Sequence, residues 1–250
     1  MSDPGFDVAR ATILRSQVGS GVLGTALEDG DRDEMGICLE PPEYVVGLLA
    51  FEHLVERTQP DGVRSGPGDL DRTTYSLRKF CRLALKGNPS VLMLLYTPRE
   101  ACTVWTAEAE ALRRLAPSFV SKAAGRAFLG YMQRQRERMA GERGQQRVHR
   151  PELIEAHGFD TKYASHMVRL GLQGVEYLRT GLLTVPIPEA EYIREIRRGL
   201  VPAASVLDVA RGLEMEIERL LAVSLLPEQA DRDVVDQFLV EAYFDHWAVG

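Results

Sequence analysis

Two aspartate pairs in the first third of the chain are spaced for metal chemistry. Asp31 and Asp33 flank a single residue at the start of a segment that reads as a short β-strand. Residues i and i+2 of a strand project from the same face, so both carboxylates would be available to one Mg²⁺ ion. Asp69 and Asp71 open a second, Thr-rich strand at 70–75. Spacing alone does not choose between them, but one would complete a two-metal site for in-line phosphoryl transfer.

A glycine-rich loop, Gly19-Ser20-Gly21-Val22-Leu23-Gly24-Thr25, precedes the first pair. Glycines let backbone N–H groups come close to a bound anion, and the Ser20 hydroxyl adds a donor. The loop has neither the G-K-[ST] of a P-loop nor a dinucleotide fingerprint, and a tight turn is the simpler interpretation of the loop alone. A phosphate-cradling loop directly followed by a strand with paired carboxylates is much rarer by chance than either feature alone.

Three cationic or titratable side chains share one face of a predicted helix at 161–181. Lys162, His166 and Arg169 are spaced i, i+4 and i+7. If this face looks toward the carboxylates, it suits an NTP triphosphate, where charge develops on the departing pyrophosphate. The alternative interpretation is an ordinary solvated or salt-bridged helix face.

The segment 122–150 carries eight basic and two acidic residues in a chain whose net charge is −6. Cations alternate there with Phe128 and Tyr131 on a predicted helix, a mixture that suits an RNA backbone and stacked bases. A solvated basic helix is the competing interpretation. The predicted RNA contacts are Arg134, Arg136 and Arg138.

The elements that must position these residues fall into two regions. Residues 1–98 mix short strands and helices, which predicts a small α/β domain on a mixed sheet; apolar spacing at 44–57 indicates a helix within it. Residues 99–250 show almost only helical periodicity, apart from a short strand-like run at 183–187, so the predicted class is α+β with a mostly helical second domain. The helices expected there span 101–115, 120–143, 161–181, 189–199, 204–224 and 231–247.

Composition excludes several classes of protein. The chain has 250 residues, of which 45% are apolar and 26% charged, as in ordinary globular proteins. Three cysteines without a C-x-x-C exclude a disulfide framework and a thiolate metal site. We find no targeting signal and no apolar run long enough to span a membrane, which predicts a cytoplasmic protein.

The motifs together resemble a known family. The run from Gly19-Ser20 through Gly24-Thr25 to Asp31-x-Asp33 resembles the signature of the DNA polymerase beta superfamily of nucleotidyltransferases. The later motifs resemble the branch found near RNA-repair genes in bacteria and phages, and the likeness spans about residues 12–200. Those motifs are Asp71 with Tyr75-Ser76-Leu77-Arg78-Lys79-Phe80, Gly87-Asn88-Pro89, and Gly158-Phe159-Asp160-Thr161-Lys162 with His166 and Arg169.

The resemblance implies transfer of a nucleotidyl group from an NTP such as ATP, with two Mg²⁺ ions, or Mn²⁺ in their place. It assigns catalysis and metal binding to Asp31, Asp33 and Asp71, which favours Asp71 over Asp69. It assigns nucleotide binding to Gly19, Ser20, Thr25, Lys162, His166 and Arg169.

Three functions are compatible with this pattern. The first is transfer to an RNA 3′ hydroxyl, of a tRNA or a damaged RNA, with release of pyrophosphate. The second keeps the chemistry but uses a small molecule or a protein side chain as acceptor, as antibiotic-modifying and toxin-type relatives do. The third is a non-catalytic nucleotide- or RNA-binding protein, which the three carboxylate positions disfavour.

Overall fold

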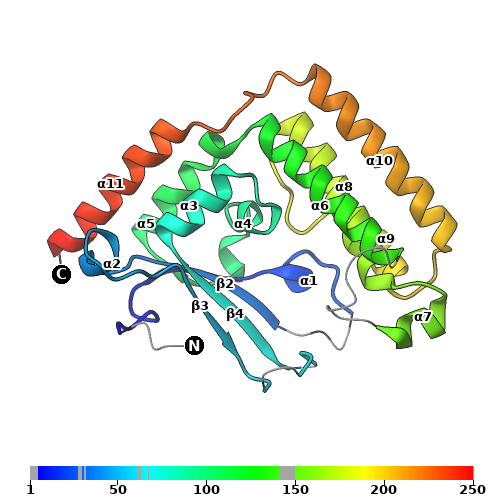
Figure 1. Cartoon of the computed structure of the whole chain (residues 1–250), viewed down its shortest axis with the longest axis horizontal. Coiled ribbons are helices and arrows are strands. Elements are labelled where there is room, and N and C mark those ends of the chain that lie inside the picture. The colour runs from blue at the N-terminus through cyan, green and yellow to red at the C-terminus, as the bar shows by residue number, and fades with distance from the viewer. Residues whose placement is uncertain are drawn as a thin grey trace.

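The computed structural model describes residues 5–27, 30, 32–60, 63–66, 68–140 and 150–249. It contains one five-stranded sheet in the first half of the chain and helices around it and beyond it (Figure 1). The strands are β1 (Thr12–Gln17), β2 (Arg32–Cys38), β3 (His53–Arg57), β4 (Leu70–Ser76) and β5 (Cys102–Trp105). The α+β prediction is therefore confirmed.

The sheet has the order β3-β4-β2-β1-β5, and β2 and β4 form its central parallel pair. The other neighbouring strands are antiparallel. Side chains of β2 are mostly buried, and those of Ile37 and Cys38 are inaccessible to solvent. Burial on both faces is typical of strands at the centre of a parallel arrangement. Both carboxylate-bearing strands thus lie in the interior of the sheet.

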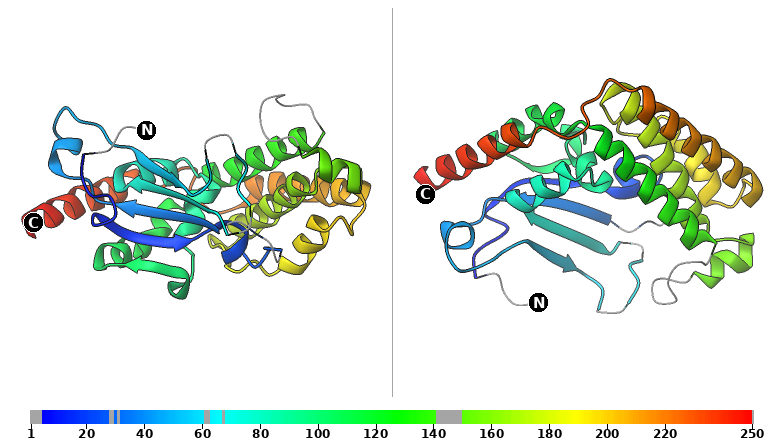
Figure 2. Two further views of the ribbon diagram at one scale, coloured as in Figure 1. Left: turned by 90° about the horizontal axis from the view of Figure 1, so that it is seen from below. Right: turned by 45° about the horizontal axis from the view of Figure 1, so that its top comes forward.

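The helices divide into short ones near the sheet and long ones beside it. Helices α6, α8 and α10 pack as a bundle next to the sheet, and α11 returns to lie along α3 (Figures 1 and 2). The short helices are α1 (Gly19–Val22), α2 (Pro42–Val45), α3 (Leu77–Leu85), α4 (Pro89–Leu94), α5 (Ala107–Arg114), α7 (Pro151–His157) and α9 (Ala190–Arg197), with 3-10 turns η1 (Arg99–Ala101) and η2 (Ala116–Phe119). The long helices are α6 (Lys122–Met139), α8 (Thr161–Thr180), α10 (Ala203–Val223) and α11 (Arg232–Val249).

One hydrophobic core runs through the sheet and the bundle. Phe80 of α3 and Phe128 of α6 are fully buried in the same cluster, and the Tyr177 hydroxyl of α8 donates to the Phe119 carbonyl at 3.1 Å. The sheet extends past the domain boundary that was expected between residues 98 and 99. Strand β5 lies after it and pairs with β1, so a cut there separates a strand from its sheet.

Three local predictions were wrong. The segment 44–57 is not a helix: α2 is a single turn, Leu48 is fully exposed, and β3 follows. Only some of its apolar residues pack on a core, and pairing with β4 determines the conformation of its second half. Residues 102–105 form β5 before α5 starts at its Thr106 cap, and residues 183–187 form no strand although Leu183 is buried.

Within the described ranges, no helix combines the length and the apolar character that crossing a bilayer requires.

Candidate active site

A cavity of about 420 Å³ lies where the ends of β2 and β4 meet α1, α8 and α9. Eight of the residues singled out in the sequence line it. They are Gly19, Ser20, Thr25, Asp33, Asp71, Lys162, His166 and Arg169. These residues come from segments far apart in the chain, so the fold brings the predicted carboxylates and the predicted cations to one space.

The carboxylates occupy one wall of the cavity. Asp33 and Asp71 are register partners in the parallel pair β2–β4. Side chains of partner residues project from the same face of a sheet, so both carboxylates face the cavity together. Asp31 lies outside the described residues, and its assignment stays a prediction.

The structure separates the two candidate third carboxylates. Asp69 does not line the cavity; its carboxylate accepts from the Gly66 N–H at 2.9 Å and from the Thr58 hydroxyl at 3.0 Å, and so holds the turn before β4. Asp71 lines the cavity. The geometry therefore agrees with the choice of Asp71.

Three neighbours hold the Asp71 carboxylate, and none of them was singled out in the sequence. Arg57 Nε and Gln59 Nε2 each lie 3.0 Å from Oδ1, and the Ser65 hydroxyl donates to Oδ2. Arg57 reaches Asp71 because the two residues are register partners of β3 and β4. Since the segment containing β3 was expected to be helical, only a strand interpretation of 53–57 could have revealed this arginine.

The glycine loop is shaped by its contact with Asp33. Gly19 has φ of +68°, and a Cβ built on it would lie 2.6 Å from the Asp33 Oδ2 atom. The Thr25 N–H donates to the Ser20 carbonyl at 2.9 Å and closes the loop over α1. Glycine is thus needed at position 19 both for the backbone conformation and for the approach of a carboxylate.

Helix α8 supplies the opposite wall. Arg169 Nη1 donates to the Gln173 side chain at 3.1 Å and forms no ion pair with any described carboxylate. Burial lowers the pKa of Arg169 to about 10, so the guanidinium remains charged at neutral pH. Burial, followed by the charges of Arg169, Lys162, Arg197 and Arg150, lowers the pKa of His166 well below its usual value.

Arg197 of α9 also lines this wall and was not singled out in the sequence. Its position depends on how α9 packs on α8, which no local motif encodes. The one sequence feature that could have pointed to Arg197 is its place as a basic residue in the last turn of a helix.

Local sequence explains how α8 is placed. Gly158 ends α7 with φ of +81°, and the buried Phe159 anchors the turn. The Asp160 carboxylate accepts from the N–H groups of Lys162 and Tyr163, both at 3.0 Å, and caps α8. The Arg150 guanidinium lies 3.2 Å from the Asp160 carboxylate and holds it in the capping position. The motif at 158–162 therefore sets the start of the helix that bears the cations.

The three arginines of α6 predicted to contact RNA have different surroundings. Arg136 is paired with the largely buried Glu214 of α10 and holds the bundle together. Arg134 lies over the Tyr131 ring at 4.2 Å, and Arg138 lies near the Tyr163 ring at 6.0 Å. Phe128, expected to supply a stacking surface, is in the core. Of the three arginines, Arg134 and Arg138 are thus better suited than Arg136 to the predicted contact with RNA.

The residues present suit a hard divalent cation. Asp33 and Asp71 offer carboxylate oxygens to one cavity, the donor type that Mg²⁺ prefers. Among the described residues, no group of three or more His, Cys, Asp and Glu side chains surrounds one metal position. Asp31, two positions before Asp33, is the expected third donor and lies outside the described residues.

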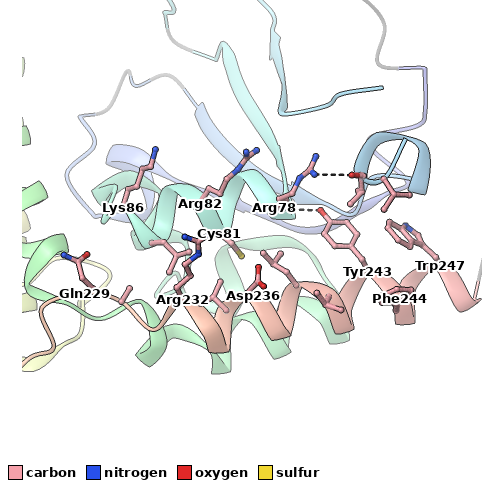
Figure 3. Close-up of a pocket in the computed structure, with 17 residues that line it drawn as sticks. Arg78, Cys81, Arg82, Lys86, Gln229, Arg232, Asp236, Tyr243, Phe244 and Trp247 are labelled. Carbon is pink, nitrogen blue, oxygen red and sulfur yellow. Dashed lines mark hydrogen bonds between the residues drawn. The ribbon is translucent and has the colours of Figure 1, made fainter. Parts of the chain in front are cut away.

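A second hollow, of about 770 Å³, lies between α3 and α11 (Figure 3). Its lining is mostly apolar and includes Tyr243, Phe244 and Trp247 of α11. Arg78 of α3 extends toward the end of α2, where its guanidinium donates to the Val45 carbonyl at 3.4 Å (Figure 3). None of the predicted site residues lines this groove, which leaves the polar cavity as the candidate active site.

Comparison with known proteins agrees with this geometry. A family model described as the RNA repair pathway DNA polymerase beta family matches residues 7–243. An uncharacterized 38.9 kDa protein of the nrdC-mobD intergenic region of Enterobacteria phage T4 is 30% identical over 89 residues, 36% of this chain and 26% of the phage protein. The chain thus matches about a quarter of the length of that relative.

Among solved structures, a nucleotidyltransferase-like protein from Exiguobacterium sibiricum 255-15 aligns over 85% of this chain and 69% of its own. The identity is 10% and the TM-score 0.31. The family match, in contrast, extends from before β1 into α11 and includes every described residue of the candidate site. The chain therefore belongs to the RNA repair pathway DNA polymerase beta family.

Proposed function

We propose that this protein transfers a nucleotidyl group from an NTP to the 3′ hydroxyl of an RNA and releases pyrophosphate. The observation that carries the proposal is the meeting of Asp33 and Asp71 with Lys162, His166 and Arg169 in one cavity. Carboxylates on one wall and cations on the other match the two needs of the reaction, an activated hydroxyl and a stabilised leaving group.

The cationic wall accounts for the leaving group. In the reaction, the hydroxyl oxygen attacks the α-phosphorus, the bond from that phosphorus to the bridging oxygen breaks, and pyrophosphate departs with that oxygen. Lys162 and Arg169 would bind the β- and γ-phosphates and neutralise the charge that develops on them. Arg169 needs an anionic partner more than an exposed arginine does, because burial lowers its pKa and none of the described carboxylates pairs with its half-buried guanidinium.

The carboxylate wall accounts for the nucleophile. Asp71 would orient the 3′ hydroxyl and accept its proton, while Gly19 and Ser20 hold the triphosphate from the loop side. Mg²⁺, or Mn²⁺ in its place, would be held by Asp31, Asp33 and Asp71 and would supply Lewis-acid stabilisation of the phosphate oxygens. The side chains of Arg57, Gln59 and Ser65 keep the Asp71 carboxylate at the cavity wall.

The test is incubation with each labelled NTP, Mg²⁺ and total RNA. Label is expected in RNA with the wild-type protein, and Asp33→Asn or Asp71→Asn should lower its incorporation on the order of a hundredfold or more. Asp69→Asn is the matched control, since Asp69 opens the same strand but does not line the cavity; its activity should remain within about twofold of wild type. Circular dichroism of each variant checks the fold.

Other results would change the assignment. Label that enters protein or a small molecule, and depends on Asp33 and Asp71, would keep the chemistry and replace RNA as acceptor. Asp33→Asn with wild-type activity would contradict the assignment of the carboxylates themselves.

A further inference from the structure

One face of α6 combines an aromatic ring with two arginines. Tyr131, Arg134 and Arg138 are spaced i, i+3 and i+7, which places them on the same side of the helix. The guanidinium carbon of Arg134 lies 4.2 Å from the centre of the Tyr131 ring, within the range of a cation–π contact. This is the mixed surface on which nucleic-acid bases stack.

The Tyr131 end of this face adjoins the active-site cavity. The Asn88 side chain donates to the Tyr131 hydroxyl at 3.2 Å and accepts from the N–H of Ser90, which lines the cavity. Tyr75, another lining residue, has a pKa raised first by burial and then by the nearby Tyr131 hydroxyl. The Tyr131 ring therefore lies at the rim, one residue away from the space where the chemistry is proposed.

The Arg138 end also leads back to the site. The Arg138 guanidinium lies 6.0 Å from the ring of Tyr163, the residue that follows the cavity-lining Lys162 on α8. We call Tyr131, Arg134, Arg138 and Tyr163 together the α6 ledge.

The charges of the ledge have no carboxylate partner among the described residues. Neither Arg134 nor Arg138 forms an ion pair with a carboxylate in the part of the chain that the structure describes. Other arginines of α6 differ, because Arg126 pairs with Glu228 at 3.2 Å and Arg136 pairs with Glu214. Among these arginines, only the two on the ledge have a charge to offer an external anion.

We propose that the α6 ledge binds the single-stranded 3′ end of the RNA acceptor; this rests on the proposed function. The terminal bases would stack on Tyr131 and on the guanidinium of Arg134, and Arg138 would contact the backbone phosphates. Stacking on a protein ring requires unpaired bases, which favours a single strand over a duplex. The seven-residue step from Tyr131 to Arg138 is about 10 Å of helix, room for about three stacked nucleotides.

The experiment measures binding of 5′-labelled single-stranded RNA oligonucleotides by fluorescence anisotropy, without NTP. Tyr131→Ala should weaken binding about tenfold, the cost of one lost stacking contact. Tyr131→Phe keeps the ring and should stay within about twofold of wild type. Arg134→Gln should also weaken binding, whereas Arg126→Gln, the same charge change on the same helix, should not. A blunt-ended RNA duplex should bind more weakly than the single strand.

Steady-state transfer separates this proposal from the proposed function. Tyr131→Ala should raise the KM for RNA and leave the KM for NTP unchanged. Equal RNA affinity of Tyr131→Ala and wild type, a Tyr131→Phe variant as weak as Tyr131→Ala, or a duplex that binds as tightly as the single strand would each overturn the ledge. Wild-type transfer to RNA with an unchanged KM in Tyr131→Ala would overturn the ledge alone, while no transfer to RNA by wild type would overturn the function itself.

Discussion

His166 and Arg169 occupy an electrostatically unusual position for side chains of one helix face. Burial lowers the pKa of each, and the charges of Arg169, Lys162, Arg197 and Arg150 lower that of His166 further. Holding a charged group at this position costs free energy, since burial removes it from water. A bound polyphosphate would offset that cost, so this wall of the cavity favours the binding of an anionic ligand.

The titration of His166 gives a prediction about nucleotide binding. In the free protein its pKa lies well below the ordinary value of 6.5, so the imidazole is neutral at pH 7. An NTP placed beside it would stabilise the imidazolium and raise that pKa, so binding takes up a proton. NTP affinity should therefore strengthen as pH falls from neutral into the acid range, by up to about tenfold per unit of pKa change.

Isothermal titration calorimetry over this pH range provides the measurement. His166→Gln should show a smaller pH dependence than wild type, while protonation of the NTP itself contributes equally to both. Superimposable pH profiles for the two proteins would separate His166 from the triphosphate.

At the scale of elements, the turn from β1 into α1 is the joint on which the carboxylate wall depends. The Val18 N–H donates to the Asp33 carbonyl at 2.9 Å, and the Asp33 side chain fills the space where a residue other than glycine at position 19 would carry its Cβ. The loop and β2 are thus in close contact, and the Asp33 side chain leaves no room for a Cβ at position 19.

Gly19→Ala should therefore damage activity more than stability. The left-handed conformation at φ +68° costs alanine about 1 kcal/mol, and the added Cβ must also displace the Asp33 carboxylate. Gly68→Ala is the matched control, because Gly68 has φ of +81° but open space where a Cβ would lie. Both variants should lose similar free energy of unfolding in urea, and only Gly19→Ala should lose most of the transfer activity. Equal activity of the two would show that Asp33 tolerates displacement.

Elements whose ends carry clear capping residues could be predicted from the sequence. Helix α8 was expected at 161–181 and spans Thr161–Thr180, because Asp160 caps its start and Gly181, with φ of +73°, ends it. Strand β3 could not be predicted, since its residues alternate weakly and it exists by pairing with β4. Strand β5 was hidden because it runs directly into the helical pattern of α5.

The same distinction applies to the candidate site. Residues carried by a motif, such as Asp33 and Lys162, were identified and lie at the cavity. Arg57 and Arg197 were not, because their positions follow from strand register and from helix packing rather than from neighbours in the sequence. The pairing of Arg136 with Glu214 was equally invisible, since the two residues are 78 positions apart.

At the scale of the whole molecule, α11 connects the far end of the described chain to the central strand of the sheet. The Tyr243 hydroxyl donates to the Glu40 carboxylate at 2.7 Å, and Trp247 Nε1 donates to the Glu40 carbonyl at 3.2 Å. Glu40 is fully buried just after β2, and that burial raises its pKa. Helix α11 therefore supplies one donor to the buried carboxyl group of Glu40 and another to its main-chain carbonyl.

Tyr243→Phe should destabilise the protein by about 1–3 kcal/mol, the cost of leaving a buried carboxyl group without its donor. Tyr192→Phe on α9 is the control, because the Tyr192 hydroxyl makes no hydrogen bond to any described residue; its change should be within about 0.5 kcal/mol. Urea denaturation followed by circular dichroism measures both. A Tyr243→Phe variant as stable as wild type would mean that the Glu40–Tyr243 bond contributes nothing to the fold.

Because α11 comes late in the chain, its contacts with Glu40 form long after the strands of the sheet have been synthesised. The ribosome completes all five strands by residue 105, but the helix that covers α3 begins only at residue 232. Until then, a nascent chain leaves Glu40 without its tyrosine partner and leaves the apolar side of α3 exposed to solvent, a surface of the kind that chaperones bind. The central strand that carries Asp33 thus reaches its final environment only after α11 has been synthesised.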